Sequence, residues 1–385
     1  MNITVRVGDL GKVITGNTPP RSNPELYGNY IPFIKATDIS ENEKYTYTPE
    51  EYYSEEGFRK YKTSLIPKHS TCVVTIGSIG KKMTMACQDC FINQAMNAII
   101  PNDDYDYEYV YYLLKNNIHK LKNLDSGTAS GRENVSKSAF MGMELSVIKD
   151  KVTQKRIGSI LSAYDDLIEN NQKQIKLLEE AAQRLYKEWF VDLRFPGHEG
   201  VKIVDGVPEG WKKEKLIELT ELKAGGDKPK IFSKIKSNIC KVPIFSNGLE
   251  NEGLFGYTDK ADIGQESITI SARGNVGYTC LRRAPYLAIV RLICVVPRKM
   301  HISTYLYFYL KHTNYNSNGS AQQQLTIPMI KNTVVCVPDE NILSDFDDKA
   351  RCYFDLVDAL KNKISSLREA RDRLLPKLMS GEIEV

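Results

Sequence analysis

The sequence has few of the residues that hold metals or cross-links, with 5 histidines, 8 cysteines and 2 tryptophans in 385 residues. Eight cysteines are too sparse for a disulfide framework in a chain of this length, so reduced thiols are expected. Cys87 and Cys90 form a CxxC pair, but a structural zinc site needs four ligands and the sequence has no second such pair. The sequence therefore predicts neither a disulfide scaffold nor a metal site.

Long apolar runs are also missing. The best candidate for a membrane helix, residues 286–296, is interrupted by Arg291, whereas a span needs roughly 20 apolar residues. The first residues, MNITVR, lack the basic and apolar segments of a signal peptide. We expect a cytoplasmic protein that does not enter a membrane.

The common catalytic motifs do not occur either. Residues 77–82 (GSIGKK) lack the spacing and the hydroxyl group of a Walker A loop. HExxH, GxSxG and a GxGxxG after a strand are absent, and the five histidines follow no pattern. Residues 18–21 (TPPR) do not form the Asn/Asp-Pro-Pro-aromatic loop with which an amino-methyltransferase stacks its target base. We therefore expect no enzyme activity, no cofactor and no bound metal.

The composition, with 42% hydrophobic and 26% charged residues, is that of a soluble protein of two or three domains. The net charge is +4, and the surplus lies in residues 200–340, which contain 19 basic and 13 acidic residues. Such a charge is compatible with a polyanionic partner but does not require one.

An internal repeat indicates two copies of one module. Matching strings follow the same order in both halves: VGDL at 7–10 and LIEL at 216–219, IPFI at 31–34 and VPIF at 242–245, IGSIG at 76–80 and RGNVG at 273–277, YVYYLLK at 109–115 and YLYFYLK at 305–311, and SGTA at 126–129 and NGSA at 318–321. The offset falls from 211 at the second pair to 197 at the third, so the first copy has 14 extra residues near 41–63. Because loop insertions change what a domain contacts more than how it folds, we expect the copies to contact different targets.

Each copy ends in a long helix with one apolar face. Steps of four and three residues, the heptad pattern of a coiled coil, connect Ile157, Leu161, Tyr164, Ile168, Asn171, Ile175, Leu178, Ala182 and Leu185, and at a constant offset of 189 they connect Phe346, Ala350, Tyr353, Val357, Leu360, Ile364, Leu367, Arg371 and Leu374. Such a face must be buried, and the helix of the other copy is the nearest partner. If a local two-fold axis relates the copies, the helices pair antiparallel.

The length of this helical seam matches a distance in DNA. Ile157 and Leu185 are about 42 Å apart along a helix, close to the ~34–36 Å between half-sites one turn apart. Asn171 interrupts the apolar seam where the second helix has Leu360. A single buried Asn can fix helix register, although a solvated Asn at a fraying point is an equal alternative.

The globular parts combine α and β structure. Short β-branched runs at 71–76, 97–101, 267–271 and 292–297 predict strands, and residues 109–122 and 303–313 predict helices. Both copies place polar loops at matching positions, namely the turns at 77–82 and 273–277 and the loops at 127–134 and 319–324.

These loops contain the side chains that DNA recognition uses. Backbone amides and cations reach phosphates, Arg pairs with guanine, and Gln or Asn pairs with adenine. The predicted DNA-contacting residues are Lys35, Thr37, Ser78, Lys81, Lys82, Ser130, Arg132 and Asn134 in the first copy, and Asn247, Arg273, Asn275, Gln322, Gln323 and Gln324 in the second. For each residue alone, a solvated loop position is the alternative.

Three further strings resemble the specificity (S) subunits of type I restriction-modification systems: LYKEWFVDLRFPG at 185–197, VPEGW at 207–211 and LLPKLMSGEI at 374–383. The resemblance covers the whole chain and implies an α+β fold in which two pseudo-symmetric α/β target-recognition domains are joined by two long antiparallel coiled-coil helices. The implied boundaries are 1–150 for the first domain, 151–190 for the first helix, 191–341 for the second domain with its linker, and 342–385 for the second helix. One departure is that the family's Pro-x-x-x-Glu-Gln stretch before each helix is reduced to Gln154 and to residues 338–340.

The resemblance also implies a function. Each domain would read one half of a bipartite site in double-stranded DNA, and the helices would set the spacer and bind two methyltransferase (M) subunits. The M subunits would bind S-adenosylmethionine and methylate adenine, while restriction (R) subunits would cut. The first alternative is a coiled-coil scaffold that binds only proteins, and the second is a nuclease or methylase.

Overall fold

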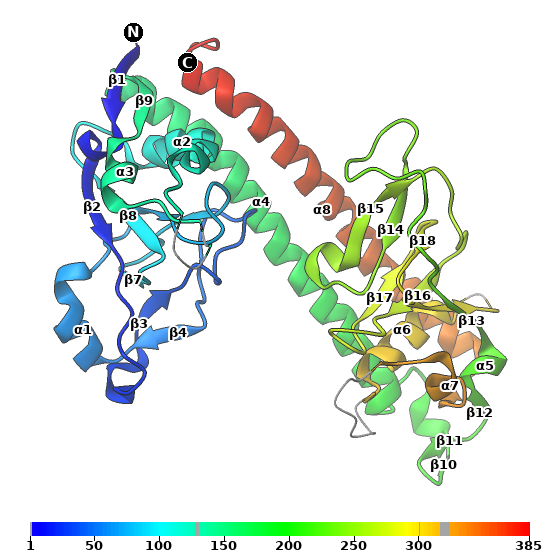
Figure 1. The fold of residues 1–385 in the computed structure, drawn as a ribbon. Helices are drawn as coiled ribbons and strands as arrows, with labels where there is room; N and C mark the ends of the chain where they lie inside the picture. The colour runs from blue at the N-terminus through cyan, green and yellow to red at the C-terminus, as the bar shows by residue number, and fades with distance from the viewer. Residues whose placement is uncertain (1, 128–130, 132, 300, 316–323) are drawn as a thin grey trace. The chain divides into compact units, whose positions relative to one another are not determined.

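The computed structural model describes residues 2–127, 131, 133–299, 301–315 and 324–385. The chain divides into two compact units, of which the first comprises residues 1–173 and 360–385 and the second residues 174–359. Two long helices, α4 (Lys151–Tyr186) and α8 (Glu340–Ser380), each contribute one part to each unit (Figure 1). Both ends of the chain belong to the first unit, where the side-chain amide of Asn2 donates to the carbonyl oxygen of Ser380 at 3.3 Å.

The described part of the first unit is built on three sheets. A four-stranded antiparallel sheet has the order β2-β8-β5-β6, a three-stranded sheet has the order β4-β3-β7, and β1 pairs with β9. The strands are β1 (Asn2–Arg6), β2 (Gly11–Thr15), β3 (Tyr27–Ile34), β4 (Glu51–Tyr53), β5 (Thr71–Val74), β6 (Met83–Met85), β7 (Phe91–Ile92), β8 (Met96–Pro101) and β9 (Glu144–Ile148), and the shorter helices are α1 (Glu55–Tyr61), α2 (Tyr107–Asn117) and α3 (Lys137–Gly142).

The second unit has the same sheet topology. Its sheets have the orders β13-β19-β16-β17, β15-β14-β18 and β12-β20, with β10 and β11 as an additional pair. The strands are β10 (Ile203–Val204), β11 (Val207–Pro208), β12 (Lys212–Lys215), β13 (Thr220–Ala224), β14 (Val242–Phe245), β15 (Leu254–Thr258), β16 (Ser267–Ile270), β17 (Thr279–Arg282), β18 (Leu287–Ala288), β19 (Ile293–Pro297) and β20 (Val334–Val337), and the helices are α5 (Leu216–Leu219), α6 (Ser303–His312) and α7 (Ile327–Ile330). The repeat in sequence is therefore a repeat in topology, and it includes a parallel pair of strands in each unit, β3 with β7 and β14 with β18.

The predicted elements occur close to their expected positions. The four β-branched runs form β5, β8, β16 and β19, and the two predicted helices form α2 and α6. Helix α2 ends at Asn117 and continues as a 3₁₀ turn at Ile118–Leu124, so the predicted helix at 109–122 is two elements.

The core of the first unit joins its sheets to both long helices. The largely apolar face of α2 shares one cluster with Ile157 and Leu161 of α4 and with Leu375 and Leu378 of α8. Further along α4, Asp165 pairs with Arg371 of α8. Rising residue numbers on α4 thus meet falling numbers on α8, which means that the two helices run in opposite directions within this unit.

The core of the second unit is rich in aromatic rings. Helix α4 ends in a π-helical turn, Lys187–Val191, and here Tyr186 stacks on Phe308 of α6 with ring centroids 5.2 Å apart. The ring centroids of Trp189 and of Phe346 in α8 lie 5.9 Å apart. Burial of such large rings contributes about 1.5–3 kcal/mol each, so the string at 185–197 has a packing role in this unit.

Polar contacts fasten the globular part of the first unit to α4. Gln154 is completely buried, accepts from the backbone N–H of Asp106 at 3.0 Å and donates to the carbonyl of Ile148 at 2.8 Å. It therefore holds together the start of α2, the end of β9 and the first turn of α4.

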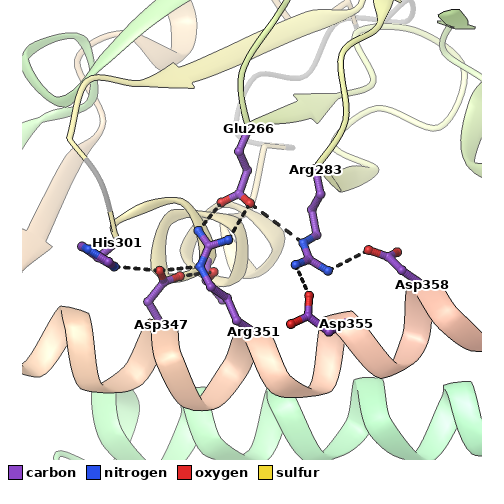
Figure 2. Close-up of polar contacts among 8 residues, drawn as sticks. Glu266, Arg283, His301, Asp347, Arg351, Asp355 and Asp358 are labelled. Atoms are coloured by element: carbon purple, nitrogen blue, oxygen red, sulfur yellow. Dashed lines mark hydrogen bonds and ion pairs between the residues drawn. The ribbon is translucent and has the colours of Figure 1, made fainter.

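The second unit uses a charged network for the same purpose (Figure 2). Arg351 of α8 binds Glu266 through two hydrogen bonds of 2.9 and 3.1 Å and Asp347 through one of 2.7 Å. Beside it, Arg283 pairs with Asp355 and Asp358 of α8. The loop before β16 and the end of β17 are thereby attached to one face of α8.

Asp347 also completes the start of α6. This helix has no side-chain cap of its own, and the buried carboxylate of Asp347 accepts from Thr304 at 2.6 Å and lies 3.1 Å from His301. At the corresponding position of α4, 189 residues earlier, stands Gly158, where an added Cβ would lie only 2.7 Å from the Cβ of Glu108. The first unit packs α2 directly on a glycine, whereas the second places there a carboxylate that contacts the side chains of Thr304 and His301 at the start of α6.

The insertion of the first copy does not simply extend into solvent. The residue Lys44 is only 5% exposed. Its ammonium group pairs with Glu108 and donates to the hydroxyl group of Ser162 of α4 at 2.8 Å. Tyr47 donates to Glu169 of α4 at 2.7 Å. Part of the inserted segment therefore links the globular part of the first unit to its helix.

Candidate nucleic-acid interface

The polar turn and the polar loop of the first copy lie side by side. The backbone N–H of Gly77 donates to the carbonyl of Glu133 at 3.0 Å, and that of Val135 donates to Thr75 at 2.8 Å. The carboxylate of Asp125 closes the loop by accepting from the N–H groups of Gly127 at 2.8 Å and Asn134 at 2.7 Å. These two hydrogen bonds lower the pKa of Asp125. The sequence analysis did not single out Asp125, although an Asp at the base of a Gly-containing loop is a common turn former.

The second unit brings its turn and loop together in the same way. The N–H of Leu325 donates to the carbonyl of Ala272 at 2.9 Å, and the guanidinium group of Arg273 donates to the side chain of Gln324 at 3.2 Å. Asn247 joins this cluster, since its amide oxygen accepts from the N–H of Ala272 and its amide nitrogen donates to Val290, both at 2.7 Å. Three residues predicted from separate loops therefore lie together.

Matched glycines shape both turns. Gly77 and Gly274 have φ of +89° and +67°, and Gly80 and Gly277 have φ of +71° and +87°. Side chains other than glycine adopt these values at a cost in free energy. The glycines that recur in the sequence thus preserve a backbone conformation, while the residues between them are free to differ.

The remaining predicted contacts have mixed positions. Ser78, Lys81 and Asn275 are exposed in their turns, Thr37 is exposed, and Lys82 and Asn134 are half-buried. Ser130, Arg132, Gln322 and Gln323 lie outside the described residues.

Lys35 is placed least favourably for a phosphate contact. Its ammonium group pairs with Glu50 and, at 3.1 Å, with Glu51, and the hydrogen bond to Glu50 raises its pKa. A phosphate would have to displace these carboxylates.

A buried polar chain that the sequence analysis missed supports the first turn. Asn97 accepts from Thr15 at 2.6 Å and donates to Thr75 at 2.8 Å, directly beneath residues 76–80. Its only sequence signal was an amide side chain inside the apolar strand MNAIIP.

The predicted helix seam is turned away from solvent. Of its eighteen residues, ten are buried, namely Ile157, Leu161, Ile168, Asn171, Ala182, Phe346, Ala350, Val357, Ile364 and Arg371, and eight are half-buried, namely Tyr164, Ile175, Leu178, Leu185, Tyr353, Leu360, Leu367 and Leu374. Asn171 is 2% exposed, and its side-chain nitrogen has no hydrogen-bond partner among the residues that the structure describes, so it lies in the seam and not in solvent.

Comparison with known proteins shows which family this chain is similar to. The family model described as the type I restriction modification DNA specificity domain matches residues 2–180 and 208–365. The chain belongs to this family. The family model matches twice, and the bounds of the two matches show that each covers one copy of the sequence repeat.

Curated relatives of this specificity-domain protein cover all or part of it. The MjaIX specificity subunit of Methanocaldococcus jannaschii is 29% identical over 99% of this chain and 93% of its own length. The HindI specificity subunit of Haemophilus influenzae is 30% identical over 45% of this chain and 38% of its own length. Both are named as specificity subunits of type I restriction enzymes, so the resemblance inferred from the three strings is confirmed.

A solved structure shows the same fold. The S subunit of the type I restriction-modification system from M. genitalium matches with a TM-score of 0.60 and 18% identity, and the match covers 98% of this chain and 96% of that one. Among the described residues, no helix is long and apolar enough to cross a membrane.

Proposed function

We propose that this chain is the sequence-specific DNA-recognition subunit of a type I restriction-modification complex and that each unit reads one half of a bipartite site. One observation carries the proposal. Both units join a Gly-containing turn to a polar loop by equivalent backbone hydrogen bonds, Val135 to Thr75 and Leu325 to Ala272, yet present different side chains there. A common scaffold with different polar side chains is suited to reading two different sequences.

Each turn and loop supplies a distinct set of contacts. In the first unit, Lys81 and Lys82 bind phosphates, and Asn134 is suited to adenine. In the second unit, Arg273 is suited to guanine and Gln324 to adenine, and the hydrogen bond between them orients both side chains. The half-sites therefore differ in sequence.

The two long helices set the spacer between the half-sites. We infer that α4 and α8 form an antiparallel coiled coil with a pseudo-two-fold axis, which is supported by the heptad pattern in both helices and by the opposite chain directions of their contacts in the first unit. The helices also bind two M subunits, which contain S-adenosylmethionine, and the complex includes R subunits. The chain itself contributes recognition without catalysis or cofactor, and it acts in the cytoplasm.

A coiled-coil protein scaffold without nucleic-acid binding is less well supported. It would account for the helices, but not for the family membership or for the recurrence of the polar turn and loop. A nuclease or methylase is weakened further by the missing catalytic motifs.

Exchange of one domain tests the proposal. Residues 1–150 are replaced by the corresponding domain of another family member, and the exchanged chain is produced with its M subunits in a host whose modified bases are then sequenced. We expect one half-site to change and the other to stay, because each unit has its own turn and loop. The reciprocal exchange of residues 191–341 is the matched control and changes the other half-site. Methylation in which both half-sites change after one exchange would disprove independent reading.

A further inference from the structure

The segment between β13 and β14 concentrates positive charge that the polar turns do not account for. Residues 227–241 (DKPKIFSKIKSNICK) contain five lysines and one acidic residue, and all five lysines are exposed. Among the described residues, none of them forms an ion pair with a carboxylate. We call residues 227–241 the lysine segment.

The segment has a defined backbone position. Ser233 exchanges two backbone hydrogen bonds of 2.9 and 2.8 Å with Tyr257 of β15, and Thr258 donates to the carbonyl of Ile231 at 2.7 Å. These contacts hold the middle of the segment on the edge of the β15-β14-β18 sheet (Figure 1). Its lysines are therefore presented from a fixed surface.

Aromatic rings orient two of the lysines. The ammonium group of Lys228 lies 3.3 Å from the ring centroid of Phe232, and that of Lys234 lies 3.8 Å from that of Phe255 while donating to the carbonyl of Phe255 at 2.9 Å. A cation over a ring keeps its charge and the rest of its hydrogen-bonding capacity. Lys230, Lys236 and Lys241 have no such contact with the described parts of the chain and are available to an anion.

The segment begins beside the candidate base-reading cluster. Gly226 accepts a backbone hydrogen bond of 2.8 Å from Val290, and the side chain of Asn247 donates to the carbonyl of the same Val290 at 2.7 Å. Phosphates flank the base edges of a DNA groove on both sides. A row of cations that starts next to Asn247 is therefore placed for the backbone beside the bases that the second unit reads.

The first unit has no equivalent of this charge. Its corresponding segment, residues 16–30, contains one basic and one acidic residue, and the basic one, Arg21, is paired with Glu51 at 2.8 Å. The first 150 residues as a whole have 17 basic and 18 acidic residues. Residues 200–340, the globular part of the second unit, have 19 basic and 13 acidic residues, so with the long helices left out this part offers DNA the greater positive charge.

We infer that the lysine segment is a phosphate-binding surface for duplex DNA and that the second unit is the electrostatic anchor of the protein. The inference rests on the proposed function. Counterion release makes such contacts independent of sequence and strongly dependent on salt. The anchor thus supplies affinity at any sequence, while the turns and loops supply specificity.

The test compares the salt dependence of DNA binding. The full chain, assembled with its M subunits, is titrated against a fluorescein-labelled 40-base-pair duplex of unrelated sequence at 50 and 200 mM KCl. The variant K230Q/K236Q/K241Q removes three free cations and keeps Lys228 and Lys234, whose contacts with the rings belong to the fold. The matched control K60Q/K62Q/K68Q removes the same charge from exposed lysines of the first unit.

We expect the rise in salt to weaken wild-type binding about 40-fold more than it weakens binding by the segment variant, as three phosphate contacts predict. The control should follow the wild type, and the preference of the variant for a duplex with the methylated site should be unchanged. Equal salt dependence of wild type and segment variant, or an equal loss in the control, would overturn the inference.

Two further outcomes separate this inference from the proposed function. If the wild type prefers its methylated site but the segment variant keeps the full salt dependence, the inference fails and the proposed function stands; if the wild type binds no duplex, both fail. Ile235 and Ile239 are 77% and 73% exposed, and basic segments with apolar side chains also bind anionic membranes. Loss of binding to phosphatidylcholine–phosphatidylserine vesicles without any change in DNA binding would assign the segment to a membrane and overturn the inference.

Discussion

Single buried charges determine how the long helices pack. Arg371 occupies a seam position at which the first helix has Ala182, and it is only 4% exposed. Its guanidinium group pairs with Asp165 of α4, which also accepts from the hydroxyl group of Tyr112. Burial, followed by the charge of Asp165, raises the pKa of Tyr112 well above its usual range, so the phenol stays protonated as a donor. Asp165 thus accepts hydrogen bonds from both Arg371 and Tyr112.

The substitution Arg371→Leu tests the role of this pair. It leaves the carboxylate of Asp165 buried without a cation, and we expect the free energy of unfolding to fall by about 3–5 kcal/mol. The double variant D165L/R371L removes both charges and should recover most of that loss. Urea unfolding of the full chain measures both effects. Arg373→Leu, which removes an exposed ion pair with Glu369, is the control and should change stability by less than about 1 kcal/mol. A single variant no less stable than this control would contradict a structural role for the pair.

Asn171, unlike Arg371 and Asp165, is a buried polar residue in the helix seam whose side chain is not fully hydrogen-bonded. Its side-chain nitrogen is buried without a partner, which costs about 1–3 kcal/mol relative to a satisfied group. The sequence left open whether this Asn lies in solvent, and its burial answers that question. Fixing the helix register remains a hypothesis for its role.

At the scale of elements, the two globular parts are fastened to the long helices by different chemistry. The first unit uses a buried amide and an amine, Gln154 and Lys44, together with the close approach of α2 at Gly158. The second unit uses Arg351, Arg283 and the carboxylates around them (Figure 2). Equivalent backbone topology is thus stabilised by unrelated side chains.

Within this network, the removal of Asp347 should lower the stability of the fold the most. Its carboxylate is fully buried and contacts Thr304, His301 and Arg351. We expect Asp347→Ala to lower the free energy of unfolding by about 3 kcal/mol, because it removes one of the two carboxylates that bind Arg351 and leaves the buried hydroxyl group of Thr304 without its acceptor. Asp355→Ala, in the same network but with a side chain 66% exposed, should cost less than about 1 kcal/mol. Thermal unfolding compares the two variants, and equal melting temperatures would show that burial does not set their importance.

At the scale of the whole molecule, both long helices contribute residues to both units. The proposed coiled coil makes a prediction about DNA that stability measurements do not test. Seven residues added to α4 and seven to α8 keep the heptad phase and lengthen each helix by about 10 Å, which corresponds to about three base pairs. We expect sequencing of modified bases to find the same two half-sites with a spacer longer by about that number.

Seven residues inserted after Lys260, in the exposed loop between β15 and β16, serve as the control for this lengthening and should leave the spacer unchanged. An unchanged spacer in the lengthened chain would show that the helices do not set it. Loss of all methylation in the lengthened chain would show that the M subunits require the original helix length.

Structural features that depend on a few neighbouring residues could be predicted from the sequence, whereas features that depend on contacts between distant residues could not. The strands at 71–76 and 292–297 and the helices at 109–122 and 303–313 were visible because their apolar patterns act over a few residues. The positions of Asn247, Arg273 and Gln324 in one cluster required the fold, since these residues come from three separate loops. Lys35 was a reasonable candidate for a phosphate contact until the fold placed Glu50 and Glu51 beside it, and the charged network on α8 and the buried Asn97 gave almost no signal.

The duplication, the extent of the two helices, the absence of a catalytic motif and the family could be recognised from the sequence alone. Each of these features depends on the spacing of residues or on short sequence motifs. Only the tertiary structure decided which cations are neutralised by neighbouring carboxylates and which, like those of residues 227–241, remain free. The physical reason is that pairing between charges depends on distances of a few ångströms between side chains remote in sequence. Those distances exist only once the sheets and helices have packed.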